Sequence, residues 1–392
     1  MKRFAFITPG FTESTIPLIQ QFLEHENYVD LYFLSRNVFT IYPAFNKKKQ
    51  TNIKLVTEIS KNVYSELHDY LGDNFNAYAI KLNRPYRTVP ILKNICLMIR
   101  RIFLNKFSSY INAAKYDGIY ILSLYDSEDS LQLCKKIKGN LIVGLHEVCK
   151  HSNPDFENVP KLIAFLSMRK IPIVVYSSKS KCDILKYKVV CDRHVYETRF
   201  GKFNTYPVFK GKSGLSPQKG YFLFMGNIKP YKGVDVFIAS ALELLKDSVD
   251  CEFIIAGSGY DASMDKVKNH NNFTIINRFI NNEELADLIA GCLAVVCPYK
   301  SASQSGVIQS AYAFNKPVIV SDLDSFRECV IENKTGEFCK VNDIESLKIA
   351  MGKFYKNTEY LKSLVWQIEH IDDILLNYSW SKIYNDYKFF WQ

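Results

Sequence analysis

The sequence predicts an α/β protein with two Rossmann-like, doubly wound domains. Apolar strand-like runs alternate with helical segments twice along the chain, and a polar segment separates the two series. A chain of 392 residues is also too long for one ordinary core, so two domains of similar size are expected. With 47% hydrophobic and 23% charged residues the chain is globular, which excludes disordered and low-complexity classes.

The first series of elements begins close to the N-terminus. We predict strands at residues 4–8, 29–34, 119–122, 141–145 and 173–176, and helices at 13–24 and 127–138. These strands are apolar at nearly every position, which is typical of parallel sheets that carry helices on both faces.

The second series follows a segment rich in Gly, Ser and Pro at 209–220, where we expect the interdomain linker. Strands are predicted at 221–225, 252–256, 274–276, 293–296 and 318–320, with helices at 234–246 and 283–290. Beyond about residue 357 the chain is helical, and its aromatic end has to cover an apolar surface: Trp380, Tyr384, Tyr387, Phe389, Phe390 and Trp391. The expected domains are therefore 1–210 and 218–370, followed by a terminal helical segment at 371–392.

The net charge of +10 is unevenly distributed, because no acidic residue lies between Asp73 and Asp117. Eight basic residues lie there among apolar ones: Lys81, Arg84, Arg87, Lys93, Arg100, Arg101, Lys106 and Lys115. This pattern predicts a basic amphipathic helix. Such a helix can lie on an anionic membrane surface, each basic group contributing about 1 kcal/mol, or it can pack on the core with a solvated basic face. No nucleic-acid recognition module accompanies it, so a nucleic-acid partner is not expected.

The ten cysteines form no CxxC pair and show no regular spacing, which fits a reducing cytoplasm. The first residues lack the apolar run of a signal peptide, and no uncharged apolar stretch reaches about 18 residues. We therefore expect a cytoplasmic protein, with contact at the inner face of a membrane still open.

Glycine turns follow the first two strands of the second series. Gly226 is followed by Asn227, Lys229 and Lys232 before a helix, and Gly257 and Gly259 end the next strand. Glycines let backbone approach a ligand, a helix start exposes N–H groups, and lysines supply positive charge, a combination suited to a diphosphate.

A run of small residues follows the strand at 293–296. It reads Cys297-Pro298-Tyr299 and then 301–310, from Ser301 through Ser305 and Gly306 to Ser310. Small residues at a helix start expose several N–H donors, which can hold phosphate or sugar oxygens. An ordinary serine N-cap is the alternative.

In the first domain, His146 directly follows the strand at 141–145. Ligands of open α/β sheets bind at the carboxyl ends of the strands, so His146 is expected in the cleft between the two domains. There it can donate a hydrogen bond or hold a developing charge.

Together these motifs resemble the retaining GT-B glycosyltransferases of sequence family 4. The resemblance covers about 221–343 and rests on Lys232-Gly233, Ala256-Gly257-Ser258-Gly259, Cys297-Pro298-Tyr299 with Ser305-Gly306, Lys316-Pro317-Val318-Ile319, and Glu328 followed by Gly336 and Asn342-Asp343. In the first half it is carried by Pro9-Gly10 and His146-Glu147. It implies the GT-B fold, in which two domains face across a cleft and a closing helix, here around Ser379-Trp380, crosses back onto the first domain.

By the same resemblance the protein is expected to be a hexosyltransferase-type enzyme. It would move a sugar from a nucleotide-diphosphate sugar to an acceptor hydroxyl with retention, in bacterial surface polysaccharide synthesis on a lipid-linked acceptor. The nucleotide sugar is a substrate, and no cofactor or metal is expected. Lys232 would contact the diphosphate, backbone of Ser305, Gly306 and Val307 would contact sugar and phosphate, and His146 would face the donor sugar. The donor-binding set is Gly10, Gly226, Asn227, Lys229, Gly257, Gly259, Arg278, Ser303, Gln304, Ser305, Gly306, Val307 and Ser310.

The sequence departs from the family pattern at two places. Asn227 stands where the family commonly has an arginine, and Lys229 can replace it only as a point charge. The family's paired glutamates are missing, with Ala302 or Ser303 and Ser310 in their places, so that Gln304, Gln309 or Ser310 would have to accept from the ribose hydroxyls. These departures leave a non-catalytic scaffold partner of an active glycosyltransferase open, and a nucleotide-sugar 2-epimerase shares the fold.

Two acidic patterns resemble metal sites. Asp322-Leu323-Asp324 has the Asp-x-Asp spacing of GT-A enzymes, but after the strand at 318–320 we expect a turn with an N-cap at Asp324 or Ser325. His146, Glu147 and His151 do not have the helical spacing of a zinc site. We therefore predict no metal site.

Overall fold

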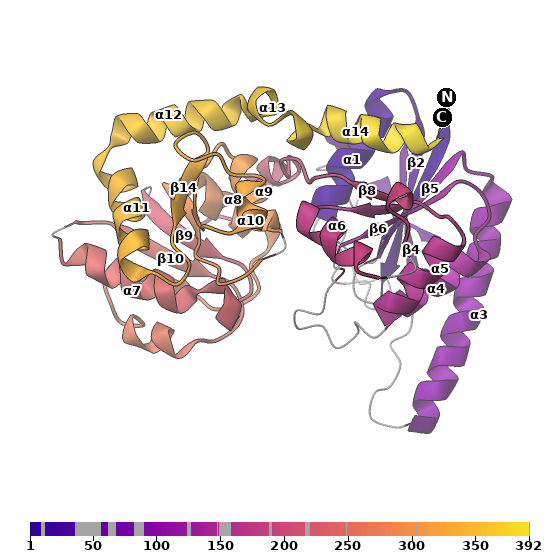
Figure 1. Ribbon diagram of the computed structural model, residues 1–392, viewed down its shortest axis with the longest axis horizontal. Helices are drawn as coiled ribbons and strands as arrows, with labels where there is room; N and C mark the ends of the chain where they lie inside the picture. The colour runs from indigo at the N-terminus through magenta and orange to yellow at the C-terminus, as the bar shows by residue number, and fades with distance from the viewer. Residues whose placement is uncertain are drawn as a thin grey trace. The chain divides into compact units, whose positions relative to one another are not determined.

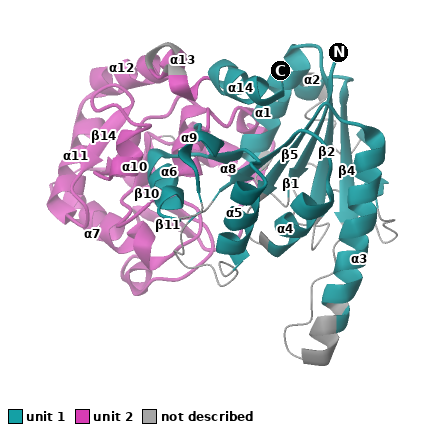
Figure 2. Ribbon diagram, turned by 45° about the vertical axis from the view of Figure 1, so that its right-hand side comes forward, with its two compact units in different colours: residues 1–199, 380–392 teal, residues 200–379 magenta. Residues whose placement is uncertain are grey.

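The computed structural model describes residues 1–8, 12–35, 56–61, 68–81, 90–123, 127–146, 148, 158–187, 190–215, 220–247, 249–302 and 304–391. Two of the expected donor-binding residues, Gly10 and Ser303, lie outside these ranges, as do Glu147 and His151. The chain forms two compact units (Figure 2): residues 1–199 with 380–392, and residues 200–379.

Unit 1 is built on an eight-stranded sheet with the order β3-β4-β2-β1-β5-β6-β7-β8. The strands are β1 Arg3–Thr8, β2 Tyr28–Ser35, β3 Val56–Glu58, β4 Phe75–Lys81, β5 Gly118–Ser123, β6 Leu141–Leu145, β7 Ile173–Val175 and β8 Val195–Glu197. Only β3 runs antiparallel to its neighbour among these strands. All five strands predicted for this half are confirmed, whereas the short β3, the alternating β4 and the three-residue β8 were not predicted.

Helices cover this sheet (Figure 1). They are α1 Thr12–Glu24, α2 His68–Leu71, α3 Pro90–Ala114, α4 Ser127–Lys136, α5 Val159–Met168 and α6 Ser178–Leu185, with a 3-10 turn η5 at Asp192–His194. Apolar residues of β1, β5, β6, α3, α4 and α5 form one buried cluster. The basic stretch thus contains the predicted helix as α3, whereas Lys81 ends β4, and Arg84 and Arg87 lie outside the described residues.

One basic residue of α3 does not lie on a solvated face. The side chain of Arg100 is only 3% exposed and forms an ion pair with Asp129 of α4, its Nε donating to Asp129 Oδ1 over 2.6 Å. The expectation that Arg100 belongs to a membrane-facing basic surface is therefore wrong, because the helix buries this position against α4.

The C-terminal segments α14 Trp380–Lys388 and η10 Phe389–Trp391 belong to unit 1. The ring of Tyr384 lies 4.8 Å from that of Phe22 on α1, and the ring of Trp391 lies 5.0 Å from that of Phe4. The indole Nε1 of Trp391 donates to the carbonyl of Asn140 over 3.1 Å. The aromatic end thus covers apolar surface as expected, but the returning segment begins at Trp380 and not at residue 371.

Unit 2 is built on an all-parallel six-stranded sheet with the order β11-β10-β9-β12-β13-β14. Its strands are β9 Tyr221–Met225, β10 Glu252–Ala256, β11 Phe273–Ile276, β12 Ala294–Cys297, β13 Val318–Ser321 and β14 Gly336–Cys339. Its helices are α7 Val234–Leu245, α8 Asn282–Gly291, α9 Gly306–Tyr312, α10 Asp324–Arg327, α11 Ile344–Lys356, α12 Thr358–Glu369 and α13 Ile371–Ile374. The 3-10 turns are η6 Tyr206–Phe209, η7 Pro230–Lys232, η8 Ala262–Lys266 and η9 Leu376–Tyr378. Alternate residues of β9 enter two separate cores, one on each face of the sheet, which explains its continuous apolar sequence.

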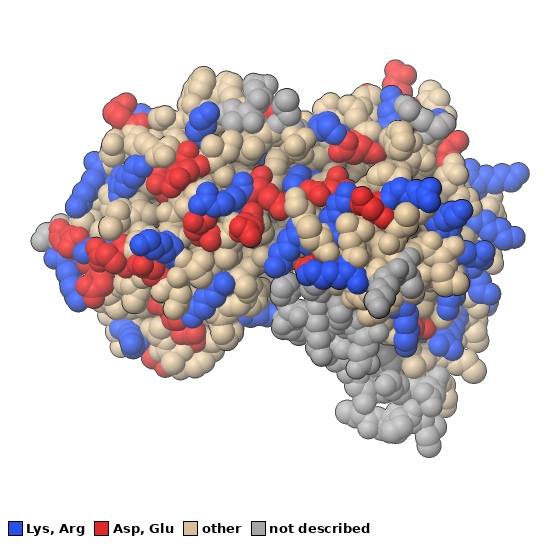
Figure 3. Space-filling model, viewed as in Figure 1, with Lys and Arg blue, Asp and Glu red and all other residues tan. Residues whose placement is uncertain are grey.

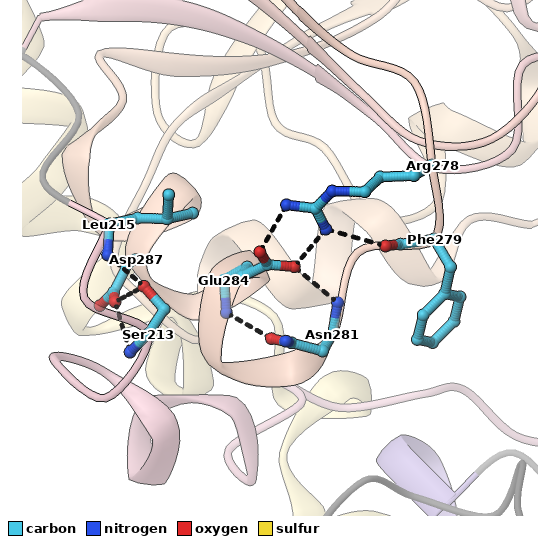
Figure 4. A network of polar contacts seen from close by, with 7 residues as sticks. All are labelled: Ser213, Leu215, Arg278, Phe279, Asn281, Glu284 and Asp287. Carbon is cyan, nitrogen blue, oxygen red and sulfur yellow. Dashed lines mark hydrogen bonds and ion pairs between the residues drawn. The ribbon is translucent and has the colours of Figure 1, made fainter.

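The Gly/Ser/Pro-rich segment is not the boundary that we expected. The backbone N–H of Gly211 donates to the carboxylate of Asp287 on α8 over 2.5 Å. The N–H of Ser213 donates to the same carboxylate over 3.2 Å (Figure 4). Tyr206 and Phe209 just before it are buried. These contacts attach the segment to unit 2, so the division falls between Arg199 and Phe200.

The Asp322-Leu323-Asp324 sequence forms the start of α10. Asp324 is the first helical residue and Leu323 holds the N-cap position, so the expected cap was placed one or two residues too late. The Asp322 carboxylate is bound by Arg327, with Nε at 2.5 Å and Nη2 at 2.7 Å. Across the described ranges, no cluster of three or more His, Cys, Asp or Glu could hold a metal ion.

None of the helices within the described ranges is both long and apolar enough to cross a bilayer.

Candidate functional site

The candidate site of unit 2 lies where three neighbouring strands end. Each of β9, β10 and β11 leads into a polar turn, and the turns are joined by backbone hydrogen bonds. The N–H of Gly226 donates to Ala256 over 2.9 Å, that of Ile228 to Ser258 over 2.8 Å, and that of Gly257 to Ile276 over 3.0 Å. The glycine turns predicted from the sequence thus lie side by side at the carboxyl ends of the strands. Gly259 forms an isolated β-bridge with Ile228.

Lys232 ends η7 directly before the left-handed Gly233, whose φ is 69°. A Cβ at Gly233 would lie 2.0 Å from the carbonyl oxygen of Pro298, so only glycine permits this approach to the end of β12. The Lys232 ammonium lies 5.2 Å from the ring centroid of the buried Tyr299, a cation–π distance. Desolvation and the nearby Lys229 lower the pKa of Lys232, while the Cys297 thiol opposes this shift.

Lys232 has no carboxylate partner among the described residues. In the part of the chain that the structure describes, no carboxylate lies within ion-pair distance of Lys232, whereas its neighbour Lys300 is paired with Asp235 at 2.7 Å. Removing a cation from water without a counter-ion costs free energy, and an anionic ligand would offset that cost. This position is therefore suited to bind a phosphate group.

The loop before α9 and the start of this helix carry the next group of expected residues. Ser305 occupies the N-cap position without a side-chain cap, and Gly306 and Val307 begin the helix. The hydroxyl of Ser310 donates to the carbonyl of Gly306 over 2.9 Å, so it satisfies the helix itself. Its oxygen keeps lone pairs that can accept a hydrogen bond, although the residue is only 4% exposed, so its expected role as an acceptor for ribose stays a prediction. Gln304 lies partly buried in the loop.

Asn227 and Lys229 are both exposed on the turn after β9. The amide oxygen of Asn227 accepts from the hydroxyl of Ser258 over 3.2 Å, which ties this turn to the one after β10. Asn227 therefore joins the two glycine turns, and Lys229 adds positive charge near Lys232.

Arg278 is occupied by protein contacts. Its guanidinium binds both oxygens of Glu284 over 2.7 and 2.6 Å and also donates to the carbonyl of Phe279 over 3.1 Å (Figure 4). Glu284 and Asn281 form a capping box at the start of α8, and the hydrogen bond from Arg278 lowers the pKa of Glu284. We therefore assign Arg278 to fixing this loop and no longer to direct donor binding. The Asn-x-x-Glu spacing of the capping box is a sequence signal that our prediction overlooked.

His146 lies in unit 1, immediately after β6. Its ring is 6.4 Å from that of Tyr176, which shares a hydroxyl–hydroxyl contact with Tyr120. Desolvation lowers the pKa of His146 to about 3, so the imidazole is neutral at physiological pH. A neutral ring can donate or accept a hydrogen bond, and it can hold a developing charge only through such a bond, because the imidazolium form is disfavoured.

Residues 206–368, which lie within unit 2, match the family model described as "Glycosyl transferases group 1". This match covers less than half of the chain. The glycine turns, Lys232 and the start of α9 all lie inside the matched residues.

Two named relatives match part of the chain. One is an uncharacterized glycosyltransferase of Methanocaldococcus jannaschii, 28% identical over 168 residues that cover 41% of this chain and 44% of that protein. The other is an alpha-D-kanosaminyltransferase of Streptomyces kanamyceticus, 26% identical over 118 residues that cover 29% of this chain and 31% of that protein. Each match thus spans less than half of the relative's own length.

Solved structures of similar fold cover nearly the whole chain. A structure of HepE from Anabaena, in complex with UDP and glucose, has a TM-score of 0.65 at 13% sequence identity and covers 99% of this chain and 98% of that one. The likeness confirms the expected fold class, two Rossmann-like α/β units as in GT-B glycosyltransferases.

Proposed function

We propose that the protein is a retaining glycosyltransferase of family 4 that moves a sugar from a nucleoside-diphosphate sugar to an acceptor hydroxyl. The observation that carries the proposal is the half-buried Lys232, which has no carboxylate in ion-pair distance among the described residues and lies beside the Gly226 turn. Glycosyl transfer from such a donor releases a nucleoside diphosphate, and a positive charge fixed beside that leaving group lowers the barrier.

The division of labour follows from the chemistry of these residues. Lys232 neutralises the departing diphosphate, and the backbone of Ser305, Gly306 and Val307 contacts sugar and phosphate oxygens. His146 is proposed to face the donor sugar as a neutral hydrogen-bonding group. The nucleotide sugar is a substrate, and the scheme requires neither a cofactor nor a metal, because Lys232 supplies the positive charge. The HepE complex with UDP and glucose makes UDP-sugars the first donors to test.

The acceptor is proposed to be lipid-linked, as in bacterial surface polysaccharide synthesis, with the protein bound to the inner face of the membrane through α3. Support comes from the side of α3 that faces away from the core, where Ile95, Met98 and Ile102 are 46%, 60% and 46% exposed. Exposed Arg101 and Lys106 lie on the same helix, and Figure 3 shows mainly Lys and Arg side chains along the edge of unit 1 that carries α3. An apolar stripe beside basic groups fits an anionic lipid surface.

Ligand-induced stabilisation tests the proposed donor site. UDP, GDP, ADP and dTDP are added to wild type, to Lys232→Ala and to Lys246→Ala, a matched change at an exposed lysine of unit 2 that pairs with Glu243. We expect at least one nucleotide to stabilise wild type and Lys246→Ala by about 2.7 kcal/mol at a hundredfold excess over Kd. Equal stabilisation of Lys232→Ala would contradict the assignment. Binding without turnover of any donor sugar would favour the scaffold role instead.

A further inference from the structure

Three tyrosine hydroxyls meet on one face of the unit 1 sheet. They belong to Tyr120 on β5, Tyr176 directly after β7 and Tyr387 on α14, and all three side chains are buried. The hydroxyls of Tyr120 and Tyr176 are hydrogen-bonded to each other, and that of Tyr387 lies 3.5 Å from the Tyr176 oxygen. The rings of Tyr120 and Tyr387 pack edge to face with centroids 5.4 Å apart. Because buried hydroxyls need partners, these contacts favour one arrangement of the three side chains.

Gly144, the fourth residue of β6, makes room for this tyrosine cluster. A Cβ at Gly144 would lie 2.5 Å from the Tyr120 hydroxyl oxygen and closer still to that of Tyr176. Gly144 is not among the glycines with a positive φ, so space and not backbone conformation requires a glycine here. The hydroxyls of the cluster therefore lie directly against the backbone of the strand that leads to His146.

Tyr176 connects the tyrosine cluster to His146. β6 and β7 are parallel, and Gly144 is paired with Val174. His146 and Tyr176, each two residues further on, are thus neighbours at the carboxyl edge of the sheet. Their ring centroids are 6.4 Å apart and the ring planes are tilted by 45°, which is within the range of aromatic pairs. The Tyr176 side chain therefore has its ring beside the imidazole and its hydroxyl at Gly144.

The third tyrosine comes from the C-terminal segment, which is anchored on both sides of Tyr387. On one side the ring of Tyr384 packs against Phe22, and Figure 1 and Figure 2 both show α14 beside α1. On the other side the ring of Trp391 packs against Phe4. Because both neighbours are fixed, Tyr387 is held over the sheet at little further cost in conformational entropy.

We infer that Tyr176 is a positioning residue for His146, and that Tyr120 and Tyr387 hold Tyr176 in place. This inference rests on the role that the proposed function gives to His146. A group acts well on a bound sugar only when it is held in the productive orientation, and packing against a buried, hydrogen-bonded neighbour supplies that restraint. The C-terminal segment would thus act on the candidate site through Tyr176.

NMR of the histidine side chains tests the inference without turnover. Ring signals of the full-length protein are recorded for wild type, Tyr176→Phe, Tyr176→Leu, Tyr387→Leu and Tyr384→Leu, and those of His146 are assigned by their loss in His146→Ala. Tyr384→Leu is the matched control, because Tyr384 is on the same helix as Tyr387 but stacks on His25, with ring centroids 4.1 Å apart. We expect Tyr176→Leu and Tyr387→Leu to broaden or split the His146 signals and to leave those of His25 unchanged. Tyr384→Leu should do the reverse.

Tyr176→Phe keeps the ring and removes only the hydroxyl, so it is the variant that disturbs folding least. It should shift the His146 signals without splitting them, because the ring remains but loses its hydrogen bond to Tyr120.

Hydrolysis of a donor sugar nucleotide adds a double-mutant cycle. Tyr176→Leu should lower kcat about tenfold, equivalent to about 1.4 kcal/mol, and leave the KM for the donor unchanged. In a His146→Ala background the same change should have no further effect on kcat, because the group that Tyr176 positions is gone. A residue that only stabilises the fold would lower kcat equally in both backgrounds.

The outcomes separate this inference from the proposed function. Unchanged His146 signals in both Tyr176 variants would overturn it, and so would equal effects of Tyr387→Leu and Tyr384→Leu on those signals. Equal losses of kcat with and without His146 would also overturn it. If His146→Ala keeps the kcat of wild type, the role of His146 fails and the positioning role with it. If wild type hydrolyses no donor, the proposed function fails, and the NMR comparison alone decides whether Tyr176 and Tyr387 fix the His146 ring.

Discussion

Gly226 keeps open the space that the Lys232 ammonium occupies. A Cβ at position 226 would lie 3.0 Å from Nζ of Lys232, and Gly226 also has a φ of 102°, where other residues are strained. The position of the Lys232 ammonium therefore depends on a glycine at 226. Substitutions at the two residues test this separately.

Gly226→Ala should weaken binding of UDP or the best nucleotide about tenfold, because the new methyl group displaces the ammonium. Left-handed backbone costs about 1–2 kcal/mol for a residue with a Cβ, so stability should fall as well. Gly214→Ala is the matched control, since Gly214 has a φ of 72° and no atom within 4 Å of an added Cβ. Denaturant unfolding and calorimetry should show both variants destabilised and only Gly226→Ala impaired in binding. Equal binding by the two variants would refute the link to Lys232.

Lys232→Met should abolish nucleotide binding but stabilise the ligand-free protein by about 1 kcal/mol, because it removes a desolvated cation that has no carboxylate partner in the described ranges. The pKa of Lys232 is lowered in the folded state, so its destabilising effect is fully present below the folded-state pKa, shrinks as pH rises above it and disappears above the unfolded-state pKa. The stability difference between Lys232→Met and wild type should therefore shrink at alkaline pH. A variant less stable than wild type at pH 7 would contradict this account.

His146→Ala should reduce kcat about a hundredfold, and His146→Asn should retain part of the activity, since asparagine can still form a hydrogen bond. Because the pKa of His146 is lowered to about 3, the ring stays neutral in the folded protein between pH 5 and pH 8. Its titration should therefore produce no inflection in the pH–rate profile over this range. An inflection near pH 6.5 that disappears in His146→Asn would show that the imidazole titrates normally.

Arg100→Ala should destabilise unit 1 by about 3 kcal/mol, because it leaves the Asp129 carboxylate without its buried partner. Arg101→Ala is the control on the adjacent position, where an exposed pair with Glu128 at 3.4 Å contributes about 0–1 kcal/mol. Chemical denaturation of both variants measures the difference. Similar stability losses would mean that the Arg100 pair does not stabilise the packing of α3 on α4.

Much of the fold could be predicted because most strands of both sheets are apolar on both faces, unlike β3, the alternating β4 and β8. β9, β10 and β6 have the predicted bounds for this reason. The boundary between the units was misplaced because a Gly/Ser/Pro-rich composition reports local flexibility and not long-range contacts. The hydrogen bond from Gly211 to Asp287 joins residues 76 positions apart, so the local sequence around Gly211 does not predict it.

The candidate site was predictable where it depends on backbone conformation and less so where it depends on side-chain partners. Gly226 and Lys232 could be placed from their position after a strand. By contrast, an arginine such as Arg278 could bind the phosphates of a donor substrate. Only the three-dimensional structure shows that its guanidinium is bound to the carboxylate of Glu284. The same holds for Arg100. Its position on a basic helix predicted a solvent-exposed side chain, but this side chain is buried against α4.

The proposed membrane contact of α3 gives the last prediction. Met98→Glu places a charge in the centre of the exposed apolar stripe, whereas Ser109→Glu adds the same charge further along the solvent side of the helix. If the stripe inserts into lipid, Met98→Glu should lose most binding to vesicles that contain anionic lipid, and Ser109→Glu should lose only the electrostatic share, about 1 kcal/mol. Cosedimentation at low and high salt separates these two contributions. Equal losses in the two variants would mean that charge alone attracts the helix, and unchanged binding of Met98→Glu would exclude the stripe as the contact surface.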